Sequence, residues 1–156
     1  AEFRRLLRED VLPSFEGYVG INNHMGSRLT QDPKAMQWLM EELKAKDLVF
    51  VDSITIQSSR AAAVAAQNGV PFARRDVFLD HHESRAAVEK SLREVEARAR
   101  VQGYAIAIGH PKPNTIAALR EWLPGLKDKG FDLVPVSTLL ERPWEDEALT
   151  AMKSGN

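Results

Sequence analysis

The stretch YVGINNHMGS at residues 18–27 joins a short apolar run to a group of polar side chains, and this pattern indicates the fold class. It recurs as FVDS, FLDH, AIGHP and VPVS at residues 50–53, 78–81, 107–111 and 134–137. Longer segments with apolar residues at helical spacing separate these runs. Such alternation is typical of βα units arranged around a parallel sheet. We therefore predict an α/β chain whose strands occupy residues 18–21, 48–51, 77–79 (or from Phe72), 104–108 and 133–136.

Helices are expected in the segments between these strands. The capping residue Asp32 and the proline after it predict a helix over residues 33–45. Ser58 or Ser59 would cap a second, alanine-rich helix, and residues 83–102 form a third helix with one charged face, as on the outside of a barrel. A fourth helix starts at Asn114 and has four apolar residues that we expect to face inward: Ile116, Leu119, Leu123 and Leu126.

The predicted strands are too few to close a parallel barrel by themselves, because such a barrel has about eight strands in its usual form. Either the sheet is open, or strands are missing at its amino end. With 156 residues, 44% of them hydrophobic, the chain can bury one core. We therefore expect residues 1–141 to form a single domain of the parallel-stranded barrel type, incomplete at the amino end, and residues 142–156 to form a tail.

Charge and composition exclude several classes of partner and site. Lys and Arg number 21 against 22 for Asp and Glu, so no basic field is available for nucleic acid. The sequence has no cysteine, so a metal would be held by histidine, carboxylate or water. Its apolar runs are shorter than the roughly 20 residues that span a bilayer. The charged residues 1–10 match neither a signal peptide nor an anchor. The composition leaves the oligomeric state open.

Polar side chains follow the ends of the predicted strands, among them His24, Asp52, Asp80 and His110. The carboxyl ends of parallel strands share one face, so these groups would be neighbours in space and could form a site. Aspartate, asparagine and serine also end strands simply to cap the next helix, and Asp52 could have only that role. Histidine caps poorly, which favours a functional role for at least one of His24 and His110.

Two other features have a plain structural explanation. His81 and His82 precede a solvent-facing helix, and we expect both to be surface residues. Arg75 could point into a barrel mouth, where it would need a carboxylate partner such as Asp52 or Asp80. It could equally lie at the surface where a strand starts.

Four segments, taken in order, resemble the motif series of the divergent polysaccharide deacetylase family: GINNHMGS at residues 20–27, FVDSIT at 50–55, RDVFLD at 75–80 and AIGHP at 107–111. The resemblance extends over about residues 17–140. It implies a distorted (β/α) barrel and a hydrolase that removes acetyl groups from the amino sugars of a polysaccharide. It also implies a divalent metal, expected to be zinc, and a periplasmic or otherwise extracytoplasmic location in a bacterium.

The resemblance suggests roles for the strand-end residues. His24 is the expected metal ligand, Asp52 a ligand or the general base, and His110 the proton donor to the leaving amine. Four residues are expected to bind substrate by shaping the cleft: Asn23, Ser53, Arg75 and Asp80. We predict that the side chains of His24, Asp52 and His110 point into one cavity, with the two imidazole rings within about 15 Å of each other.

Other functions stay open at this point. Family members have one strand that ends in Asp-Asp and another that ends in a His-x-Pro stretch, and neither occurs in this sequence. The chain would then be the carboxyl-terminal portion of such a protein, or a protein with an impaired metal site. The alternative is a protein of the cell envelope that binds glycan or a partner without turnover. A sugar-phosphate enzyme is a weaker candidate, because no glycine-rich phosphate loop precedes a helix.

Overall fold

All strand pairs among the described residues are parallel, as the sequence pattern predicts. A computed structural model describes residues 2–140. Its strands are β1 (Gly20–Asn22), β2 (Val49–Asp52), β3 (Phe72–Arg74), β4 (Val77–Phe78) and β5 (Ala107–Ile108). Its α-helices are α1 (Glu2–Leu6), α2 (Ser27–Thr30), α3 (Pro33–Ala45), α4 (Ala61–Asn68), α5 (Arg85–Gln102), α6 (Pro113–Trp122) and α7 (Val136–Leu140), joined in places by short π and 3-10 turns. The fold is thus α/β with parallel strands.

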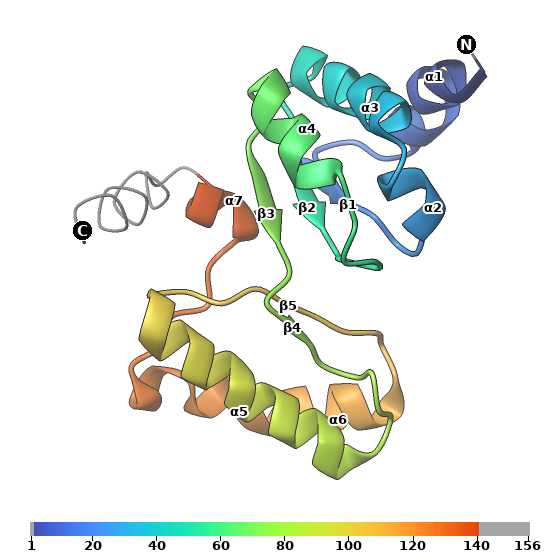
Figure 1. The fold of residues 1–156 in the computed structure, drawn as a ribbon. Helices are drawn as coiled ribbons and strands as arrows, with labels where there is room; N and C mark the ends of the chain where they lie inside the picture. The colour runs from blue at the N-terminus through green and yellow to red at the C-terminus, as the bar shows by residue number, and fades with distance from the viewer. Residues whose placement is uncertain (1, 141–156) are drawn as a thin grey trace, which may run out of the picture.

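The strands form two sheets, whereas the sequence pattern predicted one. One sheet has the order β1-β2-β3 and the other pairs β4 with β5 (Figure 1). The run taken as a single third strand is divided at Arg75. The Arg75 amide still donates to Asp52 of the first sheet, but the Asp76 and Val77 amides donate to Ile106, beside β5. A closed barrel is not seen in the described residues.

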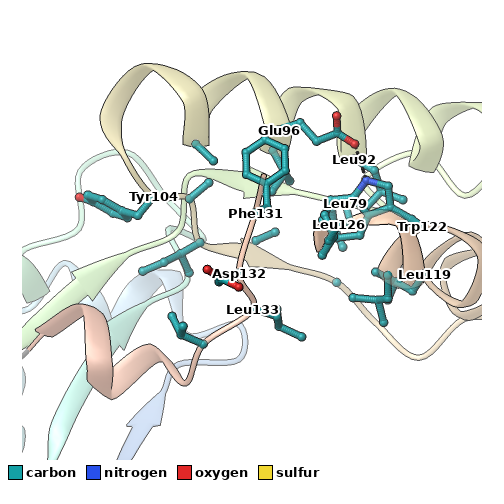
Figure 2. Close-up of a pocket in the computed structure, with 18 of the residues that line it drawn as sticks. Leu79, Leu92, Glu96, Tyr104, Leu119, Trp122, Leu126, Phe131, Asp132 and Leu133 are labelled. Carbon is teal, nitrogen blue, oxygen red and sulfur yellow. Dashed lines mark hydrogen bonds between the residues drawn. The ribbon is translucent and has the colours of Figure 1, made fainter. Parts of the chain in front are cut away.

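The predicted fifth strand at residues 133–136 is wrong, because this segment pairs with no strand among residues 2–140 and α7 begins at its end. A strand needs a neighbouring backbone to satisfy its amides and carbonyls, and β5 pairs with β4 alone in the described sheets. Leu133 is 77% exposed. Figure 2 shows this segment passing the cavity of about 930 Å³ that α5 and α6 also line, where Trp122 donates to Glu96.

The predicted helices form, with local differences. The Asp32 carboxylate caps α3 by accepting from the Lys34 and Ala35 amides. The residue that precedes α4 is Arg60, although the Ser59 hydroxyl accepts from the amide of the first helical residue at 3.3 Å. In α6 the expected inward stripe is only partly correct. Ile116 is 39% exposed, because the short helix buries a side nearer to Ala118, and Leu123, also 39% exposed, lies beyond the helix in a 3-10 turn.

The outer side of the strands is packed, while part of their inner side is open. Helices α3 and α4 form one core with the strand residue Phe50, which is 1% exposed, and α5 and α6 form a second core with Val77. On the other side, Val19 is 61% exposed beside β1. A groove of about 440 Å³ runs between β1, β2, β5 and the segment that precedes α7. Parallel sheets are normally covered on both faces, so this groove marks uncovered sheet.

The predicted tail at residues 142–156 lies outside the described residues. Within the described part of the chain, no helix is long and apolar enough to cross a membrane.

Candidate functional site

The imidazole rings of His24 and His110 meet although they follow different strands. Their centroids are 5.7 Å apart and their planes are nearly perpendicular. Met25 and Gly26, both with positive φ, turn the chain sharply after His24, and the Asn23 side chain donates to the Met25 carbonyl at 3.2 Å. The predicted proximity of the two rings is therefore confirmed.

Asp80 holds His110 from behind. Its side chain is buried, and its Oδ2 atom accepts from the His110 amide at 2.7 Å and from the Thr115 hydroxyl at 3.1 Å. Its Oδ1 atom lies 3.1 Å from Nδ1 of His110. Burial alone would raise the pKa of Asp80, but the hydrogen bonds from His110 and Thr115 lower it overall. The carboxylate therefore stays ionised and favours a proton on Nδ1 of the ring.

Asp52 occupies the matching position at the end of β2, with a different set of contacts. Its side chain is 1% exposed, and Oδ1 accepts from the Ile54 amide at 2.9 Å. Its Oδ2 atom is buried and has no hydrogen-bond partner among the described residues. Ile54 has a φ of 48°, which is unusual for a β-branched residue. No hydrogen bond or ion pair joins Asp52 to His24 or His110 in this part of the chain.

Arg75 ties the chain that follows Asp52 to β4. Its Nε atom donates to the Ser53 carbonyl at 2.7 Å and its Nη2 atom to the Ile54 carbonyl at 3.0 Å. The expected carboxylate ion pair is not formed, because backbone oxygens take these donors instead. Burial lowers the pKa of Arg75, and the negative charge of Asp52 opposes that change. The guanidinium also lies 5.2 Å from the centre of the Phe78 ring.

Two asparagines link the end of β1 to the end of β2. The Ser53 amide donates to Oδ1 of Asn23 at 2.8 Å, and the Asn22 side chain donates to the Ser53 hydroxyl at 3.1 Å. Asn23 and Ser53 therefore cross-link two strand ends. Asn22 was not among the predicted site residues, although its place beside Asn23 in the GINNH stretch could have indicated it.

Phe78 and Thr115 were also missed. The Phe78 ring lies 5.6 Å from the His110 ring and 6.0 Å from the His81 ring, so it forms a wall beside the histidine pair. Its place two residues before Asp80 on a strand was the available sign, because alternate strand residues share a face. His81 and His82 are exposed, as predicted.

A catalytic metal ion at this site would need several protein ligands. Over residues 2–140 no group of three or more His, Asp or Glu side chains is placed to hold a metal ion. Three protein ligands are the usual minimum for a catalytic zinc. The described residues thus do not form a complete metal centre by themselves.

Comparison with known proteins places these strand-end residues in a family. The family model for divergent polysaccharide deacetylases matches residues 1–140. The chain belongs to this family. An uncharacterized protein of Haemophilus influenzae is 42% identical over 135 residues, which cover 86% of this chain and 46% of that protein. The uncharacterized protein YibQ of Escherichia coli is 37% identical over 145 residues, covering 93% and 45%.

A crystal structure of a similar protein supports the fold of this family member. The uncharacterized protein ATU2773 from Agrobacterium tumefaciens superposes with a TM-score of 0.76 at 28% identity, over 78% of this chain and 50% of that one. The chain spans about half the length of the curated relatives it matches. The family match includes all the strand-end residues described above.

Proposed function

We propose that this chain carries the histidine side of a hydrolytic site that removes acetyl groups from amino sugars of a polysaccharide. One observation carries the proposal. A buried carboxylate, Asp80, bonds the Nδ1 side of His110, while the same ring contacts His24. A carboxylate that orients an imidazole in this way is the arrangement that general acid–base catalysis uses. Family membership supplies the substrate class.

The proposed chemistry uses His110 as the general acid. With Nδ1 directed to Asp80, the Nε2 atom accepts or donates no hydrogen bond within the described chain, and the side chain is 36% exposed. Protonated at Nε2, the ring donates its proton to the amine nitrogen as the C–N bond of the acetamido group breaks. The ionised Asp80 stabilises the imidazolium before that transfer.

Asp52 is proposed as the general base. Its Oδ2 atom is the one buried side-chain oxygen or nitrogen without a partner among the described residues. A carboxylate oxygen in that state gains most from a new donor. It would take the proton of the water molecule whose oxygen attacks the acetyl carbonyl. Asn23, Ser53 and Arg75 would keep the base in place through the contacts described above.

Family membership also suggests a divalent metal, and we propose His24 as a ligand of zinc. The described residues do not complete such a centre, and no step given above depends on one. Calorimetric titration of zinc into wild-type protein and into His24→Ala tests the assignment. We expect the variant to lose binding, and equal binding by both proteins would remove His24 from the metal site.

The proposal also concerns the barrel architecture and the location of the protein. We propose that β1 to β5 are part of a distorted (β/α) barrel in an extracytoplasmic protein. The open groove beside β1 and β5, with Val19 61% exposed, supports this arrangement because an apolar sheet face calls for a covering layer.

Release of acetate from an N-acetylated amino-sugar oligomer tests the function directly. We expect His110→Ala to reduce turnover by about 100-fold or more, the contribution of a positioned general acid. Binding of the oligomer should persist. Val101→Ala is the matched control, because Val101 is 89% exposed on the last turn of α5. Turnover unaffected by His110→Ala would exclude the proposed acid.

A second candidate function is binding of the glycan without turnover. The lack of a three-ligand group among residues 2–140 favours it. Wild-type protein that binds the oligomer and releases no acetate, with or without added zinc, would establish this function in place of hydrolysis.

A further inference from the structure

The four histidines of the sequence lie in one continuous run of ring contacts. His24 touches His110 with centroids 5.7 Å apart, and His110 lies 5.6 Å from Phe78. Phe78 lies 6.0 Å from His81, and His81 lies 4.9 Å from His82. The run begins after β1, crosses the end of β5 and continues past the end of β4. It therefore extends well beyond the histidine pair of the proposed site.

The outer part of this run, at His81 and His82, is accessible to a ligand. His81 and His82 are exposed, and neither imidazole makes a hydrogen bond or ion pair to another of the described residues. Phe78 is half-buried, and the Arg75 guanidinium lies over its ring, 5.2 Å from the ring centre. The run thus combines one fixed apolar ring with two rings whose nitrogens are available to a partner.

The charge next to the run disfavours a highly charged ligand. Glu83 follows His82 directly and pairs with Lys112 at 2.9 Å, so these two opposite charges offset each other. Asp80 is buried behind His110 and Arg75 donates to backbone carbonyls. A neutral ligand with apolar faces and polar edges matches this surface best.

We propose that Phe78, His81 and His82 form a second sugar subsite. The ligand is then a linear N-acetylated oligosaccharide of which more than one sugar unit is bound. This inference rests on the proposed function, which places the reacting unit at His24 and His110. A pyranose presents C–H groups on its faces and hydroxyl groups around its rim. An aromatic ring packs against the faces, and an imidazole also donates to or accepts from a hydroxyl. The neighbouring unit lies over the outer rings.

Affinity as a function of ligand length tests the subsite. N-acetylglucosamine and its β-1,4-linked tetramer are titrated into the full chain by calorimetry, and binding is mapped by amide chemical shifts. We expect the tetramer to bind wild type more tightly than the monomer. His81→Ala and His82→Ala should each weaken the tetramer roughly three- to tenfold, the range of one aromatic contact, and leave the monomer unchanged. Both side chains are exposed, so the variants keep the fold.

The outcomes separate the two proposals. Val101→Ala, an exposed change at the far end of α5, should leave both affinities unchanged. If tetramer and monomer bind equally, or if both histidine variants retain full tetramer affinity, the subsite is overturned while the proposed function stands. If wild type binds neither sugar, the proposed function and the subsite both fail.

Discussion

Asp80 and Asp52 end two strands in the same way but differ in what surrounds them. Both side chains are 1% exposed. The oxygens of Asp80 contact the His110 amide, the His110 ring and the Thr115 hydroxyl. Among the described residues, the Asp52 carboxylate accepts only from the Ile54 amide, through Oδ1, and its Oδ2 atom has no partner. We call the end of β4 at Asp80 the closed strand end, because both carboxylate oxygens have partners, and the end of β2 at Asp52 the open strand end, because one oxygen has none among the described residues.

The difference shows that burial by itself does not identify a functional carboxylate. Buried polar groups are normally hydrogen-bonded, so a saturated one such as Asp80 can be explained as a fixed part of the structure. Its contacts hold the backbone and the ring of His110. An unsaturated buried oxygen such as that of Asp52 carries a free-energy cost that a donor from outside would remove. This difference supports the proposal that the closed strand end positions His110 and that the open one takes part in the reaction.

Replacing each aspartate by asparagine tests this difference most strongly. In Asp80→Asn the N–H₂ group replaces one acceptor, either the oxygen beside Nδ1 of His110 or the oxygen that accepts from the His110 amide and the Thr115 hydroxyl, and the charge is lost, so we expect stability to fall by about 2–3 kcal/mol. In Asp52→Asn the oxygen that accepts from Ile54 can be kept, and the loss should stay below about 1 kcal/mol. Urea unfolding followed by circular dichroism measures both. Equal losses would contradict the assignment of a closed and an open strand end.

Arg75 tests what holds the open strand end. Arg75→Met leaves the Ser53 and Ile54 carbonyls without their donors, and we expect a loss of about 1–2 kcal/mol because these partly buried oxygens regain some water. Arg75→Lys keeps the charge but not the planar fork, and should recover only part of the loss. Unfolding curves of the two variants give the values. If lysine restored the full stability, charge alone, and not the hydrogen bonds to two carbonyls, would support the open strand end.

The pH dependence of stability follows from the closed strand end. The folded pKa of Asp80 is below its ordinary value, so the unfolded state takes up the proton first. The stabilisation is fully present above about pH 4, the ordinary aspartate range, and is lost as pH falls below it. We expect the slope of stability against pH in acid to be smaller in Asp80→Asn than in wild type. Asp52→Asn is the control and should keep the wild-type contribution of Asp80.

The sequence was sufficient to bring His24 and His110 together. Polar groups after parallel strands must share one face, and the two rings do meet at 5.7 Å. The bond between Asp80 and His110 could not be predicted in the same way, because it depends on register. Phe78 pairs with Ile108, so the residues two places further along face each other. Strand periodicity gives the side on which a residue points but not its partner across the ladder.

The sequence was insufficient where pairing depends on more than local pattern. The third strand was predicted at residues 77–79, or from Phe72 as a single strand, yet the chain leaves the first sheet at Arg75, whose side chain bonds back to Ser53. Residues 133–136 have a strand-like composition, yet no neighbouring strand pairs with them in the described chain. One of the two alternatives for Arg75 was an ion pair with a carboxylate, but its guanidinium donates to the Ser53 and Ile54 carbonyl oxygens instead.

The smallest effect concerns the backbone of the open strand end. Ile54 has a φ of 48°, and a left-handed conformation costs a β-branched residue roughly 1–2 kcal/mol. Asparagine tolerates that conformation, so Ile54→Asn relieves strain while it removes a half-buried apolar side chain. Ile56→Asn is the matched control, because Ile56 is also half-buried and has no positive φ. We expect Ile54→Asn to be less destabilising than Ile56→Asn by about 1 kcal/mol, measured by urea unfolding. If the two substitutions cost the same, the turn after Asp52 is unstrained, and the open strand end differs from the closed one only in the missing hydrogen bond.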